Sequence, residues 1–267
     1  MIIKDKNLKT AIQAALKAGE AIMKIYNTSF DVEIKDDKSP LTKADKEANK
    51  IINSYLLKTE IPIISEENKQ IDYAVRKQWD TCWVVDPVDG TKEFIKRNGE
   101  FTVNIALVEK GKPILGVIYV PAETTLYFAE VSSKKGYKAK LNSHTETLEQ
   151  VNHKAILLQT KTTTNAIKVV GSRSHMSSET LDFVETLKAT GKDVAIVSKG
   201  SSLKFCLTAE GNVDIYPRFA PTMEWDTAAG QAICNAVGIA VISEATKQPL
   251  LYNKEDLLNP WFVVSKQ

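Results

Sequence analysis

The sequence predicts an α/β protein in the broad sense, with helices and sheets in layers as in α+β folds. Three patterns along the chain support this fold class. Apolar residues near the start recur every three or four positions, which is the spacing of amphipathic helices. Between Phe101 and Val131, runs rich in Val, Ile and Tyr are broken by Gly- and Pro-containing turns, as in an antiparallel meander. From about Ala166, strand-like and helix-like segments alternate, as in a sheet covered by helices.

In the first half we expect two helices and then short strands. Leu8–Tyr26 carries apolar residues at helical spacing. Thr42 stands ahead of a second apolar series and three residues before an acidic one, so we expect it to cap a helix that reaches about Lys58. Two short buried strands should follow, Ile61–Ser65 and Trp83–Val85, and each leads into acidic residues.

In the second half we expect strands and helices in alternation. They are strand Ile167–Val170, helix Ser178–Ala189, strand Val194–Val197, helix Ser201–Glu210, strand Val213–Tyr216, helix Asp226–Ala236 and strands Ile239–Ile242 and Trp261–Val264. The segment Lys134–Thr164 is polar and rich in Lys, Thr and Asn. We therefore place a domain boundary there, with an N-terminal α+β domain at 1–135 and a C-terminal α/β domain at 136–267.

Composition limits the class of protein. The 267 residues are 43% hydrophobic, which is enough for a sizeable core, and the net charge of +2 argues against a nucleic-acid partner. No apolar run approaches the roughly 18 residues of a membrane span, so we expect a cytoplasmic protein. Cys82, Cys206 and Cys234 are widely spaced in apolar surroundings and should be buried free thiols. With three scattered histidines, any bound metal should have oxygen ligands.

The stretch Trp83–Phe94 holds the strongest functional signal. A short apolar run ends at Asp86, Pro87, Val88 and Asp89, and a Gly-Thr pair follows. An Asp-Gly pair between apolar flanks is also typical of a plain hairpin turn. From this stretch alone, a plain turn and a functional site are about equally expected. The acidic spacing does not fit a calcium loop, and the chain lacks the phosphate-loop motif of nucleotide hydrolases.

Acidic residues gather at four places at the ends of predicted elements: Asp45, Glu66 with Glu67, Asp86 with Asp89, and Asp226. Each has a structural alternative, because Asp45 could only charge the first turn of a helix, the glutamates could belong to a solvated loop and Asp226 could be an N-cap. Their joint presence favours a shared site. Phosphate ester hydrolysis brings water to a phosphorus shielded by negative oxygens, and carboxylate-bound magnesium neutralises that charge.

Two strings and an acidic pair resemble the signature of the inositol monophosphatase superfamily, whose members are magnesium-dependent and lithium-sensitive phosphatases. They are Asp86-Pro-Val-Asp89-Gly90-Thr91, Trp225-Asp226-Thr-Ala-Ala-Gly230 and Glu66-Glu67 upstream. The segments from Asp89 to Asn104, Gly171 to His175, Gly200 to Cys206 and Tyr216 to Asp226 resemble the bacterial 3′(2′),5′-bisphosphate nucleotidases. The resemblance implies the sugar-phosphatase fold, with alternating αβαβα layers.

The resemblance also implies a set of metal ligands and a catalytic pair. One magnesium ion would be held by Glu66, Asp86 and the carbonyl of Val88, and a second by Asp86, Asp89 and Asp226. A third ion near Glu66 would make two or three per site. Asp45 and Thr91 would position and deprotonate the attacking water. Glu67 would act behind the metal ligands.

The same resemblance implies the substrate contacts. The backbone amides of Gly90 and Thr91 would hold the scissile phosphate, beside the ligands Glu66, Val88, Asp89 and Asp226. The nucleotide would lie against the second half of the chain. Its contacts there would be His175, Gly200, Ser201 and Lys204. Ordinary roles remain as alternatives, since Lys204 could be a helix-surface lysine and His175 a loop histidine. Arg173 and Arg218 are further candidates that could instead be ion-pair partners.

The resulting prediction is a phosphatase that removes the 3′-phosphate of adenosine 3′,5′-bisphosphate by direct attack of a metal-activated water, giving AMP and phosphate. The resemblance places this reaction in sulfur metabolism. Inositol monophosphate or fructose 1,6-bisphosphate as substrate, or a non-catalytic nucleotide sensor, are the alternatives. We expect no transmembrane segment and leave open peripheral association with the inner face of the membrane. A monomer and a homodimer both remain open.

Overall fold

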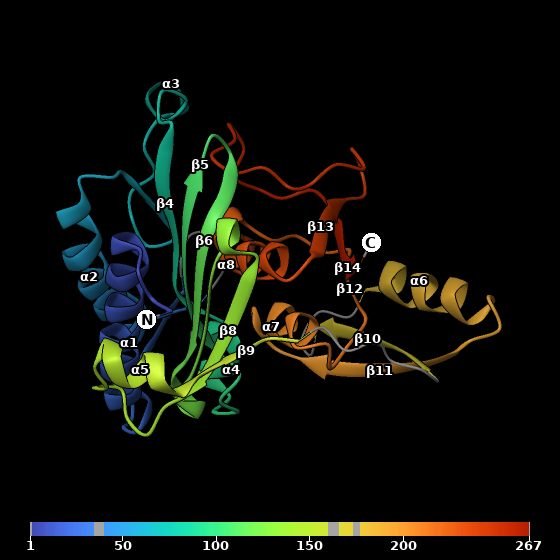
Figure 1. The fold of residues 1–267 in the computed structure, drawn as a ribbon, viewed down its shortest axis with the longest axis horizontal. Coiled ribbons are helices and arrows are strands. Elements are labelled where there is room, and N and C mark those ends of the chain that lie inside the picture. Colours follow the sequence, from blue (N-terminus) through green and yellow to red (C-terminus); the bar gives the residue numbers. More distant parts are fainter. Residues whose placement is uncertain (1, 35–39, 160–165, 173–176, 267) are drawn as a thin grey trace.

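The computed structural model describes residues 2–34, 40–159, 166–172 and 177–266, and their main strands form two sheets (Figure 1). Within the described residues, the first sheet has seven strands in the order β3-β4-β5-β6-β7-β8-β9. They are β3 (Ile63–Ser65), β4 (Thr81–Asp89), β5 (Thr102–Glu109), β6 (Lys112–Val120), β7 (Thr125–Glu130), β8 (Lys135–Lys140) and β9 (Ala155–Leu157). All neighbours pair antiparallel except β3 and β4, which are parallel.

The second sheet, again within the described residues, has five strands in the order β11-β10-β12-β14-β13. They are β10 (Ala166–Ser172), β11 (Asp193–Lys199), β12 (Ile215–Arg218), β13 (Ile239–Ser243) and β14 (Phe262–Lys266). Strands β10, β11 and β12 run parallel to one another, whereas β14 is antiparallel to both of its neighbours. A small ribbon of β1 (Val32–Ile34) and β2 (Pro40–Thr42) lies apart from both sheets.

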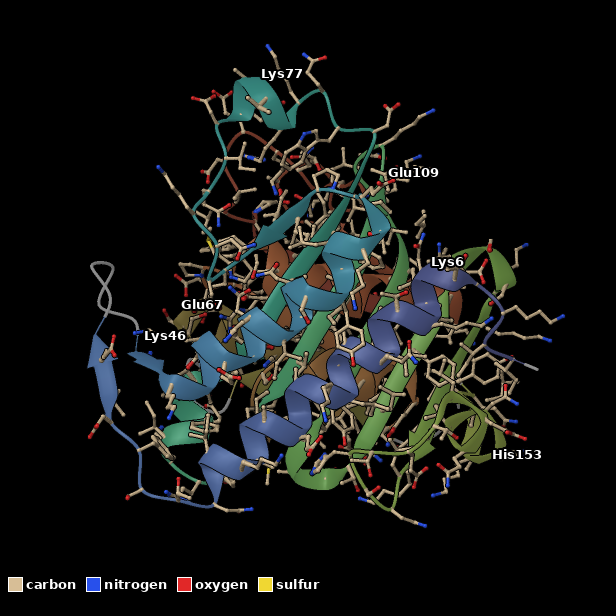
Figure 2. The ribbon with its side chains drawn as sticks, turned by 90° about the vertical axis from the view of Figure 1, so that its left-hand side faces the viewer. Lys6, Lys46, Glu67, Lys77, Glu109 and His153 are labelled. Carbon is tan, nitrogen blue, oxygen red and sulfur yellow. The ribbon has the colours of Figure 1, made fainter. Side chains whose placement is uncertain are left out.

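Helices complete five layers. Helices α1 (Lys6–Tyr26) and α2 (Lys43–Leu56) lie side by side across one face of the first sheet (Figure 2). Helices α7 (Leu203–Ala209) and α8 (Glu224–Ala236) lie between the two sheets, and α6 (Ser178–Lys188) packs on the second sheet. The shorter helices are α3 (Tyr73–Arg76), α4 (Thr91–Ile95) and α5 (Leu148–Lys154). The predicted αβαβα layering is therefore confirmed.

Two layers approach closely where α8 crosses β6. Gly116 on β6 makes this approach possible, because a Cβ atom there would lie 2.4 Å from the carbonyl oxygen of Ala229 and 2.8 Å from Cβ of Ala232. Apolar side chains surround this crossing, in a core shared by the first sheet, α7, α8 and the second sheet. A separate core lies under α1 and α2. Helix α8, and with it Asp226, is thus held tightly against the first sheet.

The predicted elements of the first half match the structure closely. The α2 helix begins after Thr42, whose side chain accepts a hydrogen bond from the Ala44 amide, while the Asp45 carboxylate accepts one from the Thr42 amide. This reciprocal arrangement is a capping box and confirms the predicted N-cap. Strand β4 is longer than the sequence predicts, because the Asp86–Asp89 segment still belongs to it.

The polar segment in which we place the domain boundary contains regular structure. It contributes β8 and β9 to the first sheet and α5 between them. Strand β8 is the polar part of this segment, with lysines at three of its six positions, whereas the edge strand β9 is Ala-Ile-Leu.

Two expectations from composition can also be compared with the structure. Cys82, Cys206 and Cys234 are all buried and free, as predicted. Among the described residues, helices long and apolar enough to span a bilayer are absent.

Candidate active site

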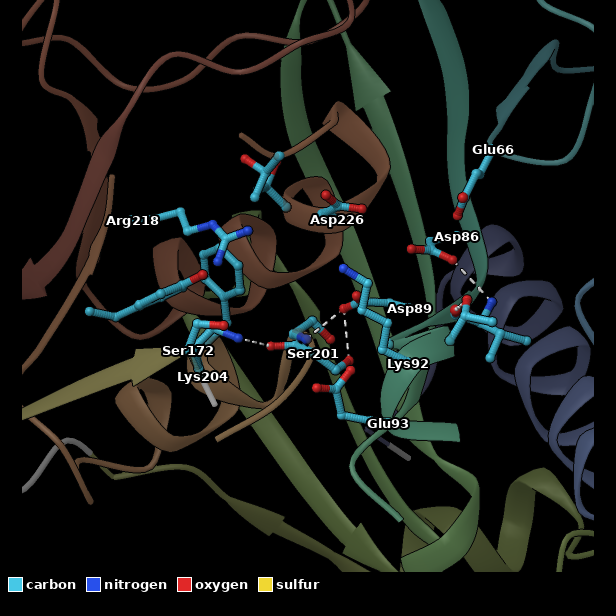
Figure 3. A pocket seen from close by; sticks show the side chains of 18 residues that line it. Glu66, Asp86, Asp89, Lys92, Glu93, Ser172, Ser201, Lys204, Arg218 and Asp226 are labelled. Atoms are coloured by element: carbon cyan, nitrogen blue, oxygen red, sulfur yellow. Dashed lines mark hydrogen bonds between the residues drawn. The ribbon is translucent and has the colours of Figure 1, made fainter. Parts of the chain in front are cut away.

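A pocket opens at the carboxyl end of β4, between the first sheet, α7, α8 and β12 (Figure 3). Its volume is about 260 Å³. The residues that line it are Glu66, Asp86, Val88, Asp89, Gly90, Thr91, Lys92, Glu93, Ser172, Ser201, Ser202, Lys204, Phe205, Tyr216, Arg218, Thr222, Asp226 and Thr227. Elements from both halves of the chain therefore supply the walls of one site.

Three carboxylates meet in this pocket. Asp86, Asp89 and Asp226 each offer an oxygen, and these oxygens all lie within 4.8 Å of one another. Asp86 and Asp89 come from the irregular end of β4, where the pairing register with β5 shifts between them. Asp226 comes from the first turn of α8, where its Oδ2 accepts the amide of Met223 at 2.9 Å. The cluster matches the oxygen-rich surroundings that hard divalent cations require.

The charge balance of this cluster favours a bound cation. Burial raises the pKa of Asp86 well above its usual range, and the charges of Glu66 and Asp89 raise it further. Burial likewise raises the pKa of Asp226, again with a contribution from Asp89. Crowded carboxylates disfavour their own ionisation, and a divalent cation reverses that effect. The residues therefore fit an oxygen-bound metal.

Thr91 connects the pocket to Asp45. Its hydroxyl lies 3.2 Å from Asp45 Oδ1 and 3.3 Å from the Val88 carbonyl oxygen. Asp45 is 2% exposed, and its other oxygen accepts both the amide and the hydroxyl of Thr42. Burial raises the pKa of Asp45, and the hydrogen bonds from Thr42 oppose that shift. Asp45 is absent from the pocket wall and can act on it through Thr91.

The two predicted glutamates occupy different places. Glu66 lines the pocket, and its charge acts on Asp86. Glu67 is not among the lining residues, and its charge contributes to the raised pKa of Asp45, after burial and the opposing bonds of Thr42. This arrangement agrees with a place for Glu67 behind the metal ligands.

The Asp-Gly pair is not a hairpin turn. Gly90 has a φ of 91°, which is in the left-handed region that glycine favours, and the short helix α4 begins directly after it. A Cβ atom at Gly90 would lie 3.0 Å from the Glu100 carbonyl oxygen. The hairpin alternative is therefore wrong, and so is the alternative that Asp226 is an N-cap, since it occupies the third position of α8.

The second half contributes a buried cation. Lys204 is 4% exposed, and its ammonium donates to the carbonyl oxygen of Ser201 at 2.5 Å and lies 5.4 Å from the centre of the Tyr216 ring. Burial lowers the pKa of Lys204 to about 8, and the charge of Arg218 acts in the same direction. The alternative of a helix-surface lysine is wrong. Figure 3 places Lys204 and Arg218 on the side of the pocket opposite Asp86 and Glu66.

The remaining predicted contacts differ in position. Ser201 lines the pocket, and its hydroxyl donates to Asp89 Oδ2 at 2.8 Å. Gly200 is absent from the pocket wall, and its amide donates to Glu100 Oε2 at 2.8 Å. His175 and Arg173 lie outside the described residues.

Sequence reasoning missed several residues at or behind the pocket wall. Ser172 ends β10 and lines the pocket, and Tyr216 on β12 packs under the Lys204 ammonium. Thr102 and Asn104 are buried on β5 behind Asp89. A polar Asn within the apolar run Val103–Val108 was an available signal, because a polar side chain in a buried strand needs partners.

Comparison with known proteins decides the family. The model of the inositol monophosphatase family matches residues 4–261. This chain belongs to that family. The inositol monophosphatase family consists of metal-dependent phosphatases, and the carboxylate cluster agrees with that chemistry.

Relatives narrow the branch of the family. The chain is 44% identical to the 3′(2′),5′-bisphosphate nucleotidase CysQ of Shigella flexneri, over 97% of this chain and 99% of that one. It is 32% identical to the CysQ nucleotidase of Haemophilus influenzae, over 99% and 94%. The crystal structure of CysQ from Bacteroides thetaiotaomicron superposes with a TM-score of 0.88 at 49% identity, over 100% and 99%. The resemblance found in the sequence is thereby confirmed.

Proposed function

We propose that this protein is a metal-dependent 3′(2′),5′-bisphosphate nucleotidase that converts adenosine 3′,5′-bisphosphate into AMP and phosphate. The main support is that one pocket has two sides of opposite charge. Asp86, Asp89 and Asp226 form the carboxylate side, and Lys204 and Arg218 form the cationic side. A substrate with two separated phosphates suits such a pocket, because one can share a cation with the carboxylates while the other meets Lys204. The likeness to CysQ nucleotidases supports the same substrate class.

Magnesium is the cation that fits the donor set. Glu66, Asp86 and the Val88 carbonyl would hold one ion, and Asp86, Asp89 and Asp226 a second, with a third near Glu66. All these donors are oxygen atoms, which magnesium prefers. When bound, magnesium neutralises phosphate oxygens and lowers the pKa of a water molecule. The raised pKa values of Asp86 and Asp226 are the features that such an ion would reverse.

The residues around the scissile phosphate have separate roles in this proposal. Thr91 Oγ1 takes a proton from the attacking water while its own proton passes to Asp45 Oδ1, 3.2 Å away. The phosphorus–oxygen bond to the ribose breaks as the water oxygen attacks in line. The ribose 3′-oxygen leaves with the bond's electron pair and takes a proton from solvent, so AMP and phosphate form without a phosphoenzyme. The amides of Gly90 and Thr91 bind phosphate oxygens, and Glu67 supports the electrostatics from behind.

The cationic side would select the nucleotide. Lys204 has its carbon chain buried, so its ammonium is a point charge already desolvated for a phosphate. Arg218 lines the same side and donates to the Pro221 carbonyl oxygen with one nitrogen. Ser201 completes this side, and Gly200 and His175 remain predicted nucleotide contacts. A division at about residue 135 separates most of the metal ligands from Asp226 and these contacts.

Cellular context follows from the same proposal. Removal of adenosine 3′,5′-bisphosphate would place the enzyme in sulfur metabolism, and lithium should inhibit it by competing at the cation sites. The three buried free thiols fit a reducing compartment such as the cytoplasm.

Initial rates of phosphate release test the substrate. The magnesium-loaded enzyme should hydrolyse adenosine 3′,5′-bisphosphate faster than inositol monophosphate or fructose 1,6-bisphosphate. The Lys204→Met variant should lose most of its activity on the adenosine bisphosphate and little on inositol monophosphate, which has no second phosphate. Faster turnover of inositol monophosphate by the unmodified enzyme would overturn the proposal. Phosphate release from none of the three would favour a nucleotide sensor.

A further inference from the structure

A buried group of polar side chains stands behind Asp89. Thr102 and Asn104 project from β5, and Ser201 and Ser202 form the turn that leads into α7. Thr102, Asn104 and Ser202 are at most 2% exposed. We call these four residues the Asp89 anchor. Thr102 and Asn104 belong to the first half of the chain, and Ser201 and Ser202 belong to the second. The four residues gather around the carboxylate of Asp89.

The anchor acts on one oxygen of Asp89. Oδ2 accepts the Ser202 amide at 2.5 Å, the Ser201 hydroxyl at 2.8 Å and the Asn104 amide nitrogen at 3.3 Å. Three donors converging on one carboxylate oxygen fix both the position and the plane of the group. Oδ2 is therefore committed to the protein, and we assign Oδ1 to the cation.

The orientation of Asn104 is itself determined. Its Oδ1 accepts hydroxyl groups from Thr102 at 2.9 Å and Ser202 at 2.8 Å. The Thr102 hydroxyl also lies 2.7 Å from the Ser201 hydroxyl and 2.8 Å from that of Ser202. The amide nitrogen must then face Asp89, because a flipped amide would set its oxygen against the carboxylate. Thr102 thus acts on Asp89 indirectly, by holding the side chain of Asn104.

Backbone geometry adds a second sign of constraint. Ser201 has a φ of 55°, in the left-handed region that residues other than glycine rarely adopt. Such conformations persist where surrounding bonds hold them. Ser201 is held by its hydroxyl on Asp89 and by its carbonyl oxygen, which accepts the Lys204 ammonium. The strained residue therefore joins Asp89 to the cationic side of the pocket.

We propose that the Asp89 anchor is a positioning device that presets this carboxylate for the cation, with Thr102 and Asn104 as positioning residues. This inference rests on the proposed function in taking Asp89 as a metal ligand. A carboxylate oriented in advance loses less freedom when the ion arrives. Removal of a side chain that holds a metal-binding residue in place typically weakens metal binding by about 10- to 100-fold.

Metal titration without substrate tests the inference. Isothermal titration calorimetry with Mn²⁺ should show about 10- to 100-fold weaker binding for Asn104→Ala and Thr102→Val. Thr102→Val keeps the side-chain shape and removes the hydroxyl, so it decides the matter if Asn104→Ala fails to fold. Thr102→Ser restores the hydroxyl and should restore the affinity. Thr125→Val is the matched control, since Thr125 is a buried threonine on β7 whose hydroxyl donates to the Glu123 carbonyl oxygen.

The outcomes separate the two proposals. Unchanged Mn²⁺ affinity in Thr102→Val would overturn the anchor, even if the variant melts at a lower temperature. Equal losses of Mn²⁺ affinity in Thr102→Val and Thr125→Val would also overturn it. The loss would then follow from removing any buried hydroxyl and not from contact with the Asp89 anchor. If the unmodified protein binds Mn²⁺ and Thr102→Val weakens that binding, but adenosine 3′,5′-bisphosphate is not hydrolysed, the anchor stands and the proposed function fails.

Discussion

The hydroxyl oxygen of Thr91 lies 3.2 Å from Oδ1 of Asp45, and this contact connects the pocket to a buried carboxylate on α2. Thr91 belongs to the pocket wall, whereas Asp45 lies behind it. The other oxygen of Asp45 completes the capping box with Thr42. One side chain therefore has two roles, since it stabilises the start of a helix and can accept a proton from the pocket.

Substitution of Asp45 by Asn should separate these roles. Asparagine keeps an oxygen for the Thr42 amide but is a poor proton acceptor, so kcat should fall by about 100- to 10,000-fold with little change in KM. Steady-state kinetics and a thermal melt measure the two effects. Asp5→Asn is the control, because the Asp5 carboxylate also accepts an amide at the start of a helix, that of Leu8 in α1, and lies outside the pocket. A raised KM with unchanged kcat in Asp45→Asn would leave Asp45 as a cap only.

Substitution of Asp226 by Asn should remove activity without unfolding the protein. The amide oxygen can still accept the Met223 amide, so the start of α8 should survive. Loss of a ligand charge should lower kcat/KM at least about 100-fold, because the bound cation supplies several kcal/mol of transition-state stabilisation. In EDTA, the melting temperature of the variant should equal or exceed that of the unmodified protein, since one buried repulsion is gone. A large decrease in EDTA would point to a structural role.

The pH dependence of kcat/KM should reveal Lys204. Its pKa in the free enzyme is lowered to about 8, so the ammonium is charged below that pH and neutral above it. For adenosine 3′,5′-bisphosphate, kcat/KM should therefore fall as pH rises through about 8, because this parameter reports groups of the free enzyme. Adenosine 3′-monophosphate lacks the second phosphate and should not show this decrease. The assignment of this decrease to Lys204 would be contradicted if both substrates gave the same pH profile. It would also be contradicted if the decrease persisted in the Lys204→Met variant.

Substitution of Gly116 by Ala should destabilise the fold. The new methyl group would meet the Ala229 carbonyl oxygen at 2.4 Å, and backbone cannot move as easily as a side chain. We expect a loss of about 3 kcal/mol in the free energy of unfolding, measured by urea denaturation. Gly191→Ala is the comparison, because a Cβ there meets nothing within 4 Å and the cost is backbone strain of about 1 kcal/mol. Equal losses would refute the packing argument.

Local signals in the sequence predicted most helices and strands, whereas the αβαβα layering and the shared site of Asp86, Asp89 and Asp226 came from the family resemblance. Thr42 and Asp45 form their capping box from residues three positions apart, so the sequence contains the whole interaction. The clustering of Asp86 with Asp226 depends on contacts between distant segments, and it was predictable because both motifs resemble the signature of one family.

Other features depend on positions that no local pattern encodes. The polar residues of β8 contributed to the placement of a domain boundary, because a polar strand and a loop have similar composition. Lys204 has the sequence context of an exposed helical lysine, yet the packing of Tyr216 buries it. Asn104 acquires its role only when the Ser201–Ser202 turn approaches from the other half of the chain.

The placement of Asp226 on a helix between the two sheets has a consequence for biosynthesis. A ribosome completes the first sheet, with Asp86 and Asp89, well before it adds α8. Until then the cluster of three carboxylates does not exist, and a truncated chain would present an incomplete set of ligands. Cation affinity would thus distinguish a fully synthesised and assembled molecule from a fragment that has folded only its first sheet.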